Sequence, residues 1–203
     1  MSKFKTIVFD WDGTIVDSNE LKRLAWLEVF PSHTKPYFLI QNRAPNLSIS
    51  TRSQILRNIF AKSGISDLTE EAFVAKYSKV YADIVERGIL QNGFLPGAKE
   101  ALENLYTKIP LYVNSATPEA PLLNIVEKIG AAKYFKKVYG RSEAQENHTQ
   151  HDLKVEILQD ISFLENISTK EMLMVGDSEA DRKSAEIFGC EFSHVSDFFK
   201  KPN

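Results

Sequence analysis

Four short apolar runs of strand character alternate with amphipathic helical segments along the chain. The runs cover residues 7–9, 111–113, 137–139 and 172–175. Helices with one apolar face are expected to begin near Pro96, Thr117, Asp152 and Ser178. Strands that alternate with helices predict a parallel sheet with helices on both faces, so the fold class is α/β.

Residues 19–90 interrupt this alternation. They contain no clear strand but three helical stretches, near residues 21–29, 51–63 and 69–87. Three prolines fall in the first half of this segment, which is therefore expected to be rich in loops: Pro31, Pro36 and Pro45. We interpret the segment as a helical block inserted after the first strand.

Composition places the chain among ordinary globular proteins. It has 203 residues, 43% hydrophobic and 26% charged, with a formal net charge of −2. Interspersed charges predict neither a nucleic-acid nor a membrane partner. Cys190 is the only cysteine, which excludes an intrachain disulfide. No apolar stretch approaches membrane-spanning length, so we expect a cytoplasmic protein. We expect it to be a monomer or a homodimer.

Polar side chains follow three of the expected strands. Asp10 and Asp12 follow the first, Ser115 the second, and Asp177 with Asp181 the last. Carboxyl ends of parallel strands share one edge of the sheet, so these residues are expected to converge there. Gathered carboxylates repel one another unless a cation neutralises them, and oxygen ligands without histidine or thiolate favour Mg²⁺.

This constellation suits phosphoryl transfer. A carboxylate such as Asp10 can attack phosphorus and form an acyl phosphate. Asp12 lies two residues further on and can face the same side, where it would protonate the leaving oxygen and later deprotonate water. Gly13 allows a tight turn that presents backbone amides to phosphate oxygens.

Further donors for a phosphate are found elsewhere in the sequence. Ser115 offers a hydroxyl and Ala116 a backbone amide, and Lys154 is the preferred cation. Arg43, in the proline-interrupted segment, is a candidate contact for a substrate anion. Three less favoured alternatives to Lys154 are Lys133, Lys136 and Lys137.

The sequence Asp-Trp-Asp-Gly-Thr at 10–14 resembles the first motif of haloacid dehalogenase-like phosphatases. Ser115 at a strand end, Lys154, and Gly-Asp-Ser-Glu-Ala-Asp at 176–181 are similar to the other three motifs, although no proline follows the lysine. The segment 118–135 resembles the phosphoglycolate phosphatase-like branch. Leu-Pro-Gly at 95–97 matches the family's return from cap to core.

The resemblance implies a Rossmann-like core of residues 1–17 and 93–203 and a small helical cap of residues 18–92. It implies a metal set of Asp10, Asp12 through its backbone carbonyl, Asp177 and Asp181, the last holding metal-bound water or Lys154. Within the first motif it also implies phosphate binding at Trp11, Gly13 and Thr14.

The predicted function is Mg²⁺-dependent hydrolysis of a small phosphomonoester, phosphoglycolate or a similar organic phosphate, through an aspartyl-phosphate on Asp10. The second acid, Asp12, argues against dehalogenation, because dehalogenase members of the family lack it. Two alternatives stay open: a sugar-phosphate phosphomutase, and a non-catalytic module that binds phosphate or metal.

Overall fold

The computed structural model of the chain describes residues 3–42, 51–145 and 147–200. The chain divides into two compact units. The larger comprises Met1–Asp17 and Asn92–Asn203, and the smaller comprises Ser18–Gln91. No helix in the described ranges has the length and apolar character needed to cross a bilayer.

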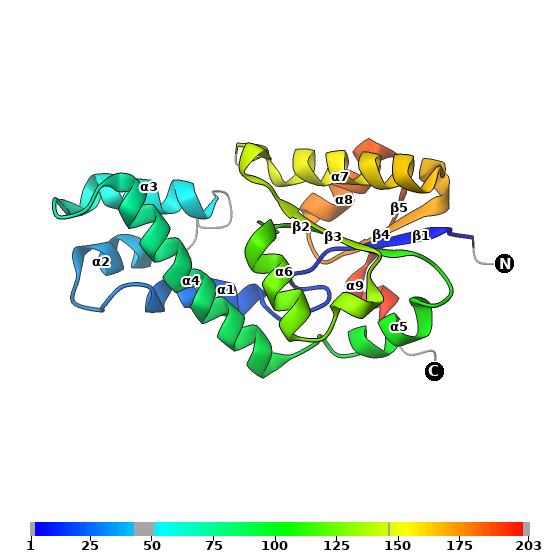
Figure 1. Cartoon of the computed structure of the whole chain (residues 1–203), viewed down its shortest axis with the longest axis horizontal. Coiled ribbons are helices and arrows are strands. Elements are labelled where there is room, and N and C mark those ends of the chain that lie inside the picture. Colours follow the sequence, from blue (N-terminus) through cyan, green and yellow to red (C-terminus); the bar gives the residue numbers. More distant parts are fainter. Residues whose placement is uncertain (1–2, 43–50, 146, 201–203) are drawn as a thin grey trace. The chain divides into compact units, whose positions relative to one another are not determined.

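The larger unit is built on a parallel sheet of five strands in the order β3-β2-β1-β4-β5 (Figure 1). The strands are β1 (Thr6–Phe9), β2 (Leu111–Pro118), β3 (Lys137–Arg141), β4 (Met172–Gly176) and β5 (Glu191–His194). The α/β prediction is therefore confirmed. The sequence interpretation missed β5, an edge strand whose four residues are all half-buried and form no apolar run.

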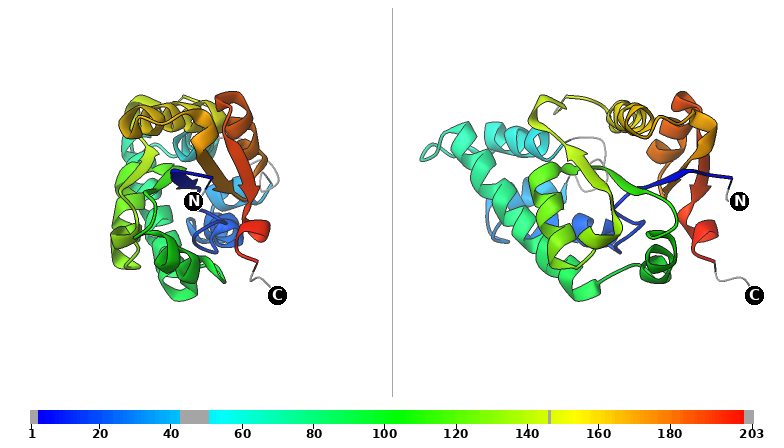
Figure 2. Two further views of the ribbon diagram at one scale, coloured as in Figure 1. Left: turned by 90° about the vertical axis from the view of Figure 1, so that its right-hand side faces the viewer. Right: turned by 45° about the vertical axis from the view of Figure 1, so that its right-hand side comes forward.

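Helices cover both faces of this sheet. α7 (Gln150–Glu165) and α8 (Glu179–Phe188) lie together on one face, and α5 (Ala98–Leu105), α6 (Glu119–Lys128) and α9 (Val195–Phe198) lie on the other (Figures 1 and 2). Short 3₁₀ turns occupy Ala132–Tyr134, Glu143–Gln145 and Thr169–Glu171. The result is the three-layer arrangement expected for a parallel sheet.

The central strand β1 contributes to the core on both faces. Val8 belongs to a buried cluster that includes Leu153 and Ile157 of α7. The next residue, Phe9, points to the opposite face, where its ring contacts those of Phe198 and Phe199 at centroid distances of 5.5 and 6.4 Å. Burial on both faces explains why β1 is apolar throughout apart from Thr6. The same packing fixes the position of Asp10, the residue that follows the strand.

The boundary between β2 and α6 differs from the prediction. A helix was expected to begin near Thr117, but β2 continues through Pro118 and α6 begins at Glu119. Pairing with β3 accounts for the longer strand, because Pro118 is in register with Arg141. Thr117 therefore lies on a strand end and not in a helix.

The smaller unit is helical. It contains α1 (Asn19–Glu28), α2 (Lys35–Gln41) and α3 (Arg52–Ser63), together with nearly all of α4 (Glu70–Asn92). The prediction of three helical stretches missed α2, because Pro36 in its first turn was taken as a helix breaker, whereas proline is tolerated there. Four rings pack in the core of this unit: Phe30, Phe60, Phe73 and Tyr77.

Candidate active site

Three carboxylates converge at the carboxyl edge of the sheet. Asp10 follows β1, Asp177 follows β4, and Asp181 lies in the first turn of α8. One carboxylate oxygen from each lies within 4.8 Å of the others. Asp10 is held by the neighbouring strand, since its backbone N–H donates to the carbonyl of Val175 at 2.8 Å. Parallel pairing of β1 with β4 thus brings together acids that are 167 residues apart in sequence (177 − 10).

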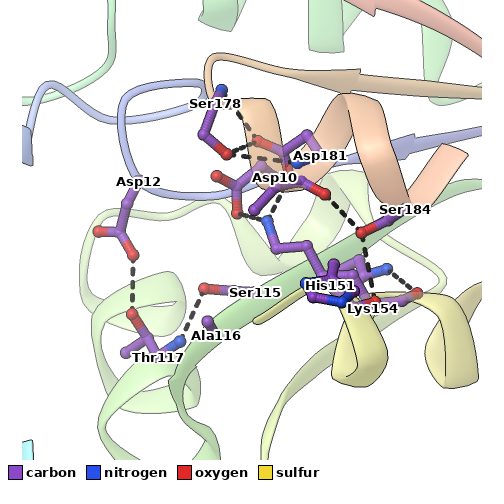
Figure 3. A network of polar contacts seen from close by, with 12 residues as sticks. Asp10, Asp12, Ser115, Ala116, Thr117, His151, Lys154, Ser178, Asp181 and Ser184 are labelled. Carbon is purple, nitrogen blue, oxygen red and sulfur yellow. Dashed lines mark hydrogen bonds and ion pairs between the residues drawn. The ribbon is translucent and has the colours of Figure 1, made fainter. Parts of the chain in front are cut away.

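Lys154 on α7 is the cation of this cluster (Figure 3). Its Nζ lies 2.8 Å from Asp10 Oδ1 and also contacts Asp181 Oδ1. Asn114 of β2 fixes the helix at this position, because its buried Nδ2 donates to the Lys154 carbonyl at 2.9 Å. The three alternative lysines have partners elsewhere: Lys133 over Tyr134, Lys136 with Glu165, and Lys137 over Tyr139.

Burial and charge shift the pKa values of this pair strongly. Burial raises the pKa of the Asp10 carboxyl, the charges of Asp181 and Asp12 raise it further, and Lys154 opposes them. Burial disfavours the charged form of Lys154, but the carboxylates of Asp10 and Asp181 outweigh this effect and raise the pKa of its ammonium. The lysine is therefore charged, and a single ammonium faces several acids.

Asp181 is fully buried and held on both oxygens. Oδ1 contacts Lys154, and Oδ2 accepts from the Ser178 backbone N–H at 3.1 Å and the Ser178 hydroxyl at 2.5 Å. This reciprocal capping box orients the first turn of α8. A Cβ at Gly176 would lie 2.4 Å from Asp181 Cγ, so only glycine fits there. The resemblance implied that Asp181 holds either metal-bound water or Lys154, and in the structure Asp181 contacts Lys154.

Asp12 points away from this cluster toward the end of β2 (Figure 3). Thr117 Oγ1 donates to Asp12 Oδ2 at 2.7 Å, and the Thr117 backbone N–H donates to Ser115 Oγ at 3.1 Å. Sequence reasoning missed Thr117 as a site residue by placing it at the start of a helix. Its place two residues after Ser115 on a strand was the available signal, because residues i and i+2 face the same side.

The loop after β1 is a tight turn. Gly13 has φ +70°, and its N–H donates to the Val16 carbonyl at 2.9 Å. The Gly13 amide is thus used within the turn, and a phosphate contact at Gly13 stays a prediction. Trp11 and Thr14 are 1% and 0% exposed as whole residues, so little of either is accessible for the phosphate contacts that the resemblance implies. Ser115 and Ala116 lie on the same end of β2 as Thr117. Arg43 lies outside the described residues.

The donor set fits a hard divalent cation. Asp10, Asp177 and Asp181 offer only oxygen, the choice of ligand that Mg²⁺ prefers. Burial is the main cause of the raised pKa of Asp10, and the charges of Asp181 and Asp12 add to it, so a cation bound beside Asp10 would favour its ionised form. Asp10 and Asp177 are the acids best suited to hold the ion, since both oxygens of Asp181 already accept from Lys154 and Ser178.

Comparisons with known proteins agree with this geometry. The sequence model of the haloacid dehalogenase-like hydrolase family matches residues 7–195. Among curated proteins, phosphoglycolate phosphatase of Vibrio parahaemolyticus is 29% identical over 199 residues, which cover 92% of this chain and 81% of that protein. Phosphoglycolate phosphatase of Escherichia coli K12 is also 29% identical, over 218 residues and 94% and 81% of the two chains.

A solved structure of a putative beta-phosphoglucomutase from Thermotoga maritima superposes with a TM-score of 0.69. It is 21% identical, and the match covers 93% of this chain and 84% of that one. At that identity the similarity shows the fold alone. The predicted superfamily, its phosphoglycolate phosphatase-like branch and the enzyme class, a hydrolase of phosphoric monoesters, are confirmed by these matches. The chain belongs to the haloacid dehalogenase-like hydrolase family.

Proposed function

We propose that this protein is a Mg²⁺-dependent phosphatase that hydrolyses a small phosphomonoester through an aspartyl-phosphate on Asp10. One observation carries the proposal: the carboxylates of Asp10, Asp177 and Asp181 lie within 4.8 Å of one another beside the ammonium of Lys154. Relatives named phosphoglycolate phosphatase favour a substrate of that size and charge. We further propose that the helical unit of residues 18–91 serves as the cap that excludes water.

The reaction has two steps on the residues of this chain. In the first, an Asp10 carboxylate oxygen attacks phosphorus, the ester P–O bond breaks, and the leaving oxygen keeps the electron pair and takes a proton from Asp12. In the second, Asp12 accepts a proton from water as the water oxygen attacks phosphorus, and the bond between phosphorus and Asp10 breaks. Inorganic phosphate leaves and both carboxyls return to their starting state.

Donors around the phosphoryl group spread its charge. Lys154 and Ser115 are the side chains proposed for this role, together with the Ala116 amide. Asp10, Asp177 and the Asp12 carbonyl would hold a Mg²⁺, which when bound would further neutralise the charge of the phosphoryl group. Lys154 also favours the ionised form of Asp10 that attacks, because their contact opposes the effect of burial on this carboxyl.

The test is phosphate release from p-nitrophenyl phosphate and a panel of small phosphate esters, with and without Mg²⁺. We expect turnover that EDTA abolishes, and a loss of about 10³-fold or more in Asp10→Asn, as for removal of a covalent nucleophile. Asp160→Asn is the matched control, since Asp160 is an exposed acid on α7. Intact-mass analysis of a rapidly quenched reaction should detect one added phosphoryl group, absent in Asp10→Asn.

The same panel distinguishes the alternatives. Isomerisation of a sugar phosphate without release of phosphate would identify a phosphomutase. Retention of phosphate on Asp10 with no turnover on any ester would identify a binding module, and either result would refute the proposed hydrolysis.

A further inference from the structure

Asp12 and Thr117 form a direct bridge between the loops that follow β1 and β2. The Thr117 hydroxyl donates to Asp12 Oδ2 at 2.7 Å, although the two residues are 105 positions apart (Figure 3). The threonine is 8% exposed, so little water competes for this bond. A hydroxyl that donates to a carboxylate is a charge-assisted interaction and is stronger than a neutral hydrogen bond.

The backbone around Thr117 is held in place by three contacts. Its N–H donates to Ser115 Oγ at 3.1 Å, and the Arg141 Nε donates to the Ala116 carbonyl at 3.4 Å. Gly140 on β3 lies so near that a Cβ there would be 2.9 Å from the Thr117 carbonyl oxygen and 2.5 Å from the Glu119 Cα. The hydroxyl of Thr117 is therefore presented from a strand end that packing and hydrogen bonds fix.

We propose that Thr117 is a positioning residue for Asp12, distinguishing the two oxygens of the acid–base carboxyl. The Thr117 proton is directed at Oδ2, which must therefore act as an acceptor. The proton that Asp12 delivers to the leaving oxygen, and later recovers from water, is then carried on Oδ1. This inference rests on the proposed phosphatase function and adds to it the residue that orients the general acid.

Orientation of the acid matters only when the leaving group needs a proton. An alkyl phosphate releases a strongly basic alkoxide that must be protonated as the P–O bond breaks. p-Nitrophenyl phosphate releases a weakly basic phenolate that can leave without that proton. Because kcat/KM reports the steps up to formation of the aspartyl-phosphate, the ratio of kcat/KM values for the two esters isolates the acid's contribution.

The experiment compares Thr117→Val, which keeps the shape of the side chain and removes the hydroxyl, with Thr117→Ser, which keeps the hydroxyl. Correct general acid catalysis contributes about 10²- to 10⁴-fold, so Thr117→Val should lower kcat/KM for an alkyl phosphate by roughly 10- to 100-fold. For p-nitrophenyl phosphate the loss should stay below about threefold, since the acid is dispensable there. Thr117→Ser should restore most of the alkyl-phosphate activity.

Two controls separate orientation from folding. Thr6→Val replaces a second buried threonine, which is 0% exposed and whose hydroxyl has no hydrogen-bond partner among the described residues, and it should change neither ester's kcat/KM. In an Asp12→Ala background, Thr117→Val should have no further effect on kcat/KM for the alkyl ester. If Thr117→Val does not fold, Thr117→Ala and the serine variant make the same comparison.

An equal loss on both esters would overturn the inference, as would wild-type values in Thr117→Val or an undiminished effect in the Asp12→Ala background. Each of those outcomes leaves the phosphatase function intact, because wild-type turnover and its loss in Asp10→Asn test that separately. A wild-type protein that hydrolyses no ester would overturn both.

Discussion

Removal of the buried lysine is the sharpest test of how the acidic cluster is stabilised. Lys154 is 2% exposed and lies between two carboxyls that are also buried, Asp10 and Asp181. In Lys154→Met the apolar stem is retained and the ammonium is lost. Asp10 and Asp181 would then share a site that water hardly reaches without the cation that compensates them, so they must either stay as uncompensated like charges or take up a proton, and both cost free energy of folding.

The size of the effect follows from this burial. Loss of one partner from a buried ion pair typically costs about 3–5 kcal/mol. For a chain of this length, 1 kcal/mol moves the melting temperature by about 2–4 °C, so a fall of roughly 10 °C is expected. Lys79 offers a matched control: it pairs with Asp83 at 2.9 Å, but 76% of its side chain is exposed. Lys79→Met should cost less than about 1 kcal/mol.

The assay is thermal unfolding followed by circular dichroism, in EDTA at neutral pH, with urea unfolding to obtain the free energy. Mg²⁺ should return part of the loss in Lys154→Met, because a cation at Asp10 and Asp177 reduces the same repulsion. The reasoning fails if Lys154→Met is destabilised no more than Lys79→Met, or if Mg²⁺ stabilises neither the variant nor the wild type.

Two more predictions concern positions that support the site and the sheet. Gly176→Ala should cost about 1–3 kcal/mol in urea unfolding and lower phosphatase activity, because the new methyl would displace Asp181; unchanged activity would show that the position of Asp181 is not critical. Glu171, which accepts from Lys5 and from Ser168, has its pKa lowered to about 2 by those bonds, the contact with Lys5 being the largest cause. A lowered carboxyl pKa stabilises the fold above the ordinary value near 4.5, and this contribution is lost as pH falls toward 2. The difference in melting temperature between wild type and Glu171→Gln should therefore shrink from pH 6 to pH 3, and a difference that does not change with pH would contradict this assignment.

Local patterns in the sequence predicted most of the larger unit. The apolar runs that became β1 and β4 are buried on both faces, so their residues carry the signal directly. β5 and the end of β2 carried no such signal. Glu191–His194 is a strand because β4 offers an edge to pair with, and 114–118 stays extended because β3 lies alongside. Pairing of this kind depends on residues far away in the chain.

The site, too, has residues that local sequence patterns predicted and contacts that depend on residues far away in the chain. Asp10, Asp12 and Asp177 were predicted because each follows a strand, and parallel strands bring their carboxyl ends to one edge. The contacts of Lys154 with Asp10 and Asp181, and the bond from Thr117 to Asp12, depend on how α7 and β2 approach the loop after β1.

Local sequence patterns were enough to predict the fold class, the edge of the sheet where the acids gather and the residue types that suit a phosphate and a divalent cation. The lysine that contacts those acids and the oxygen of Asp12 that accepts from Thr117 became evident only in the folded chain. Side-chain periodicity and strand ends depend on neighbours in sequence, whereas a hydrogen bond of 2.7 Å requires two separate segments to be placed within a fraction of an ångström.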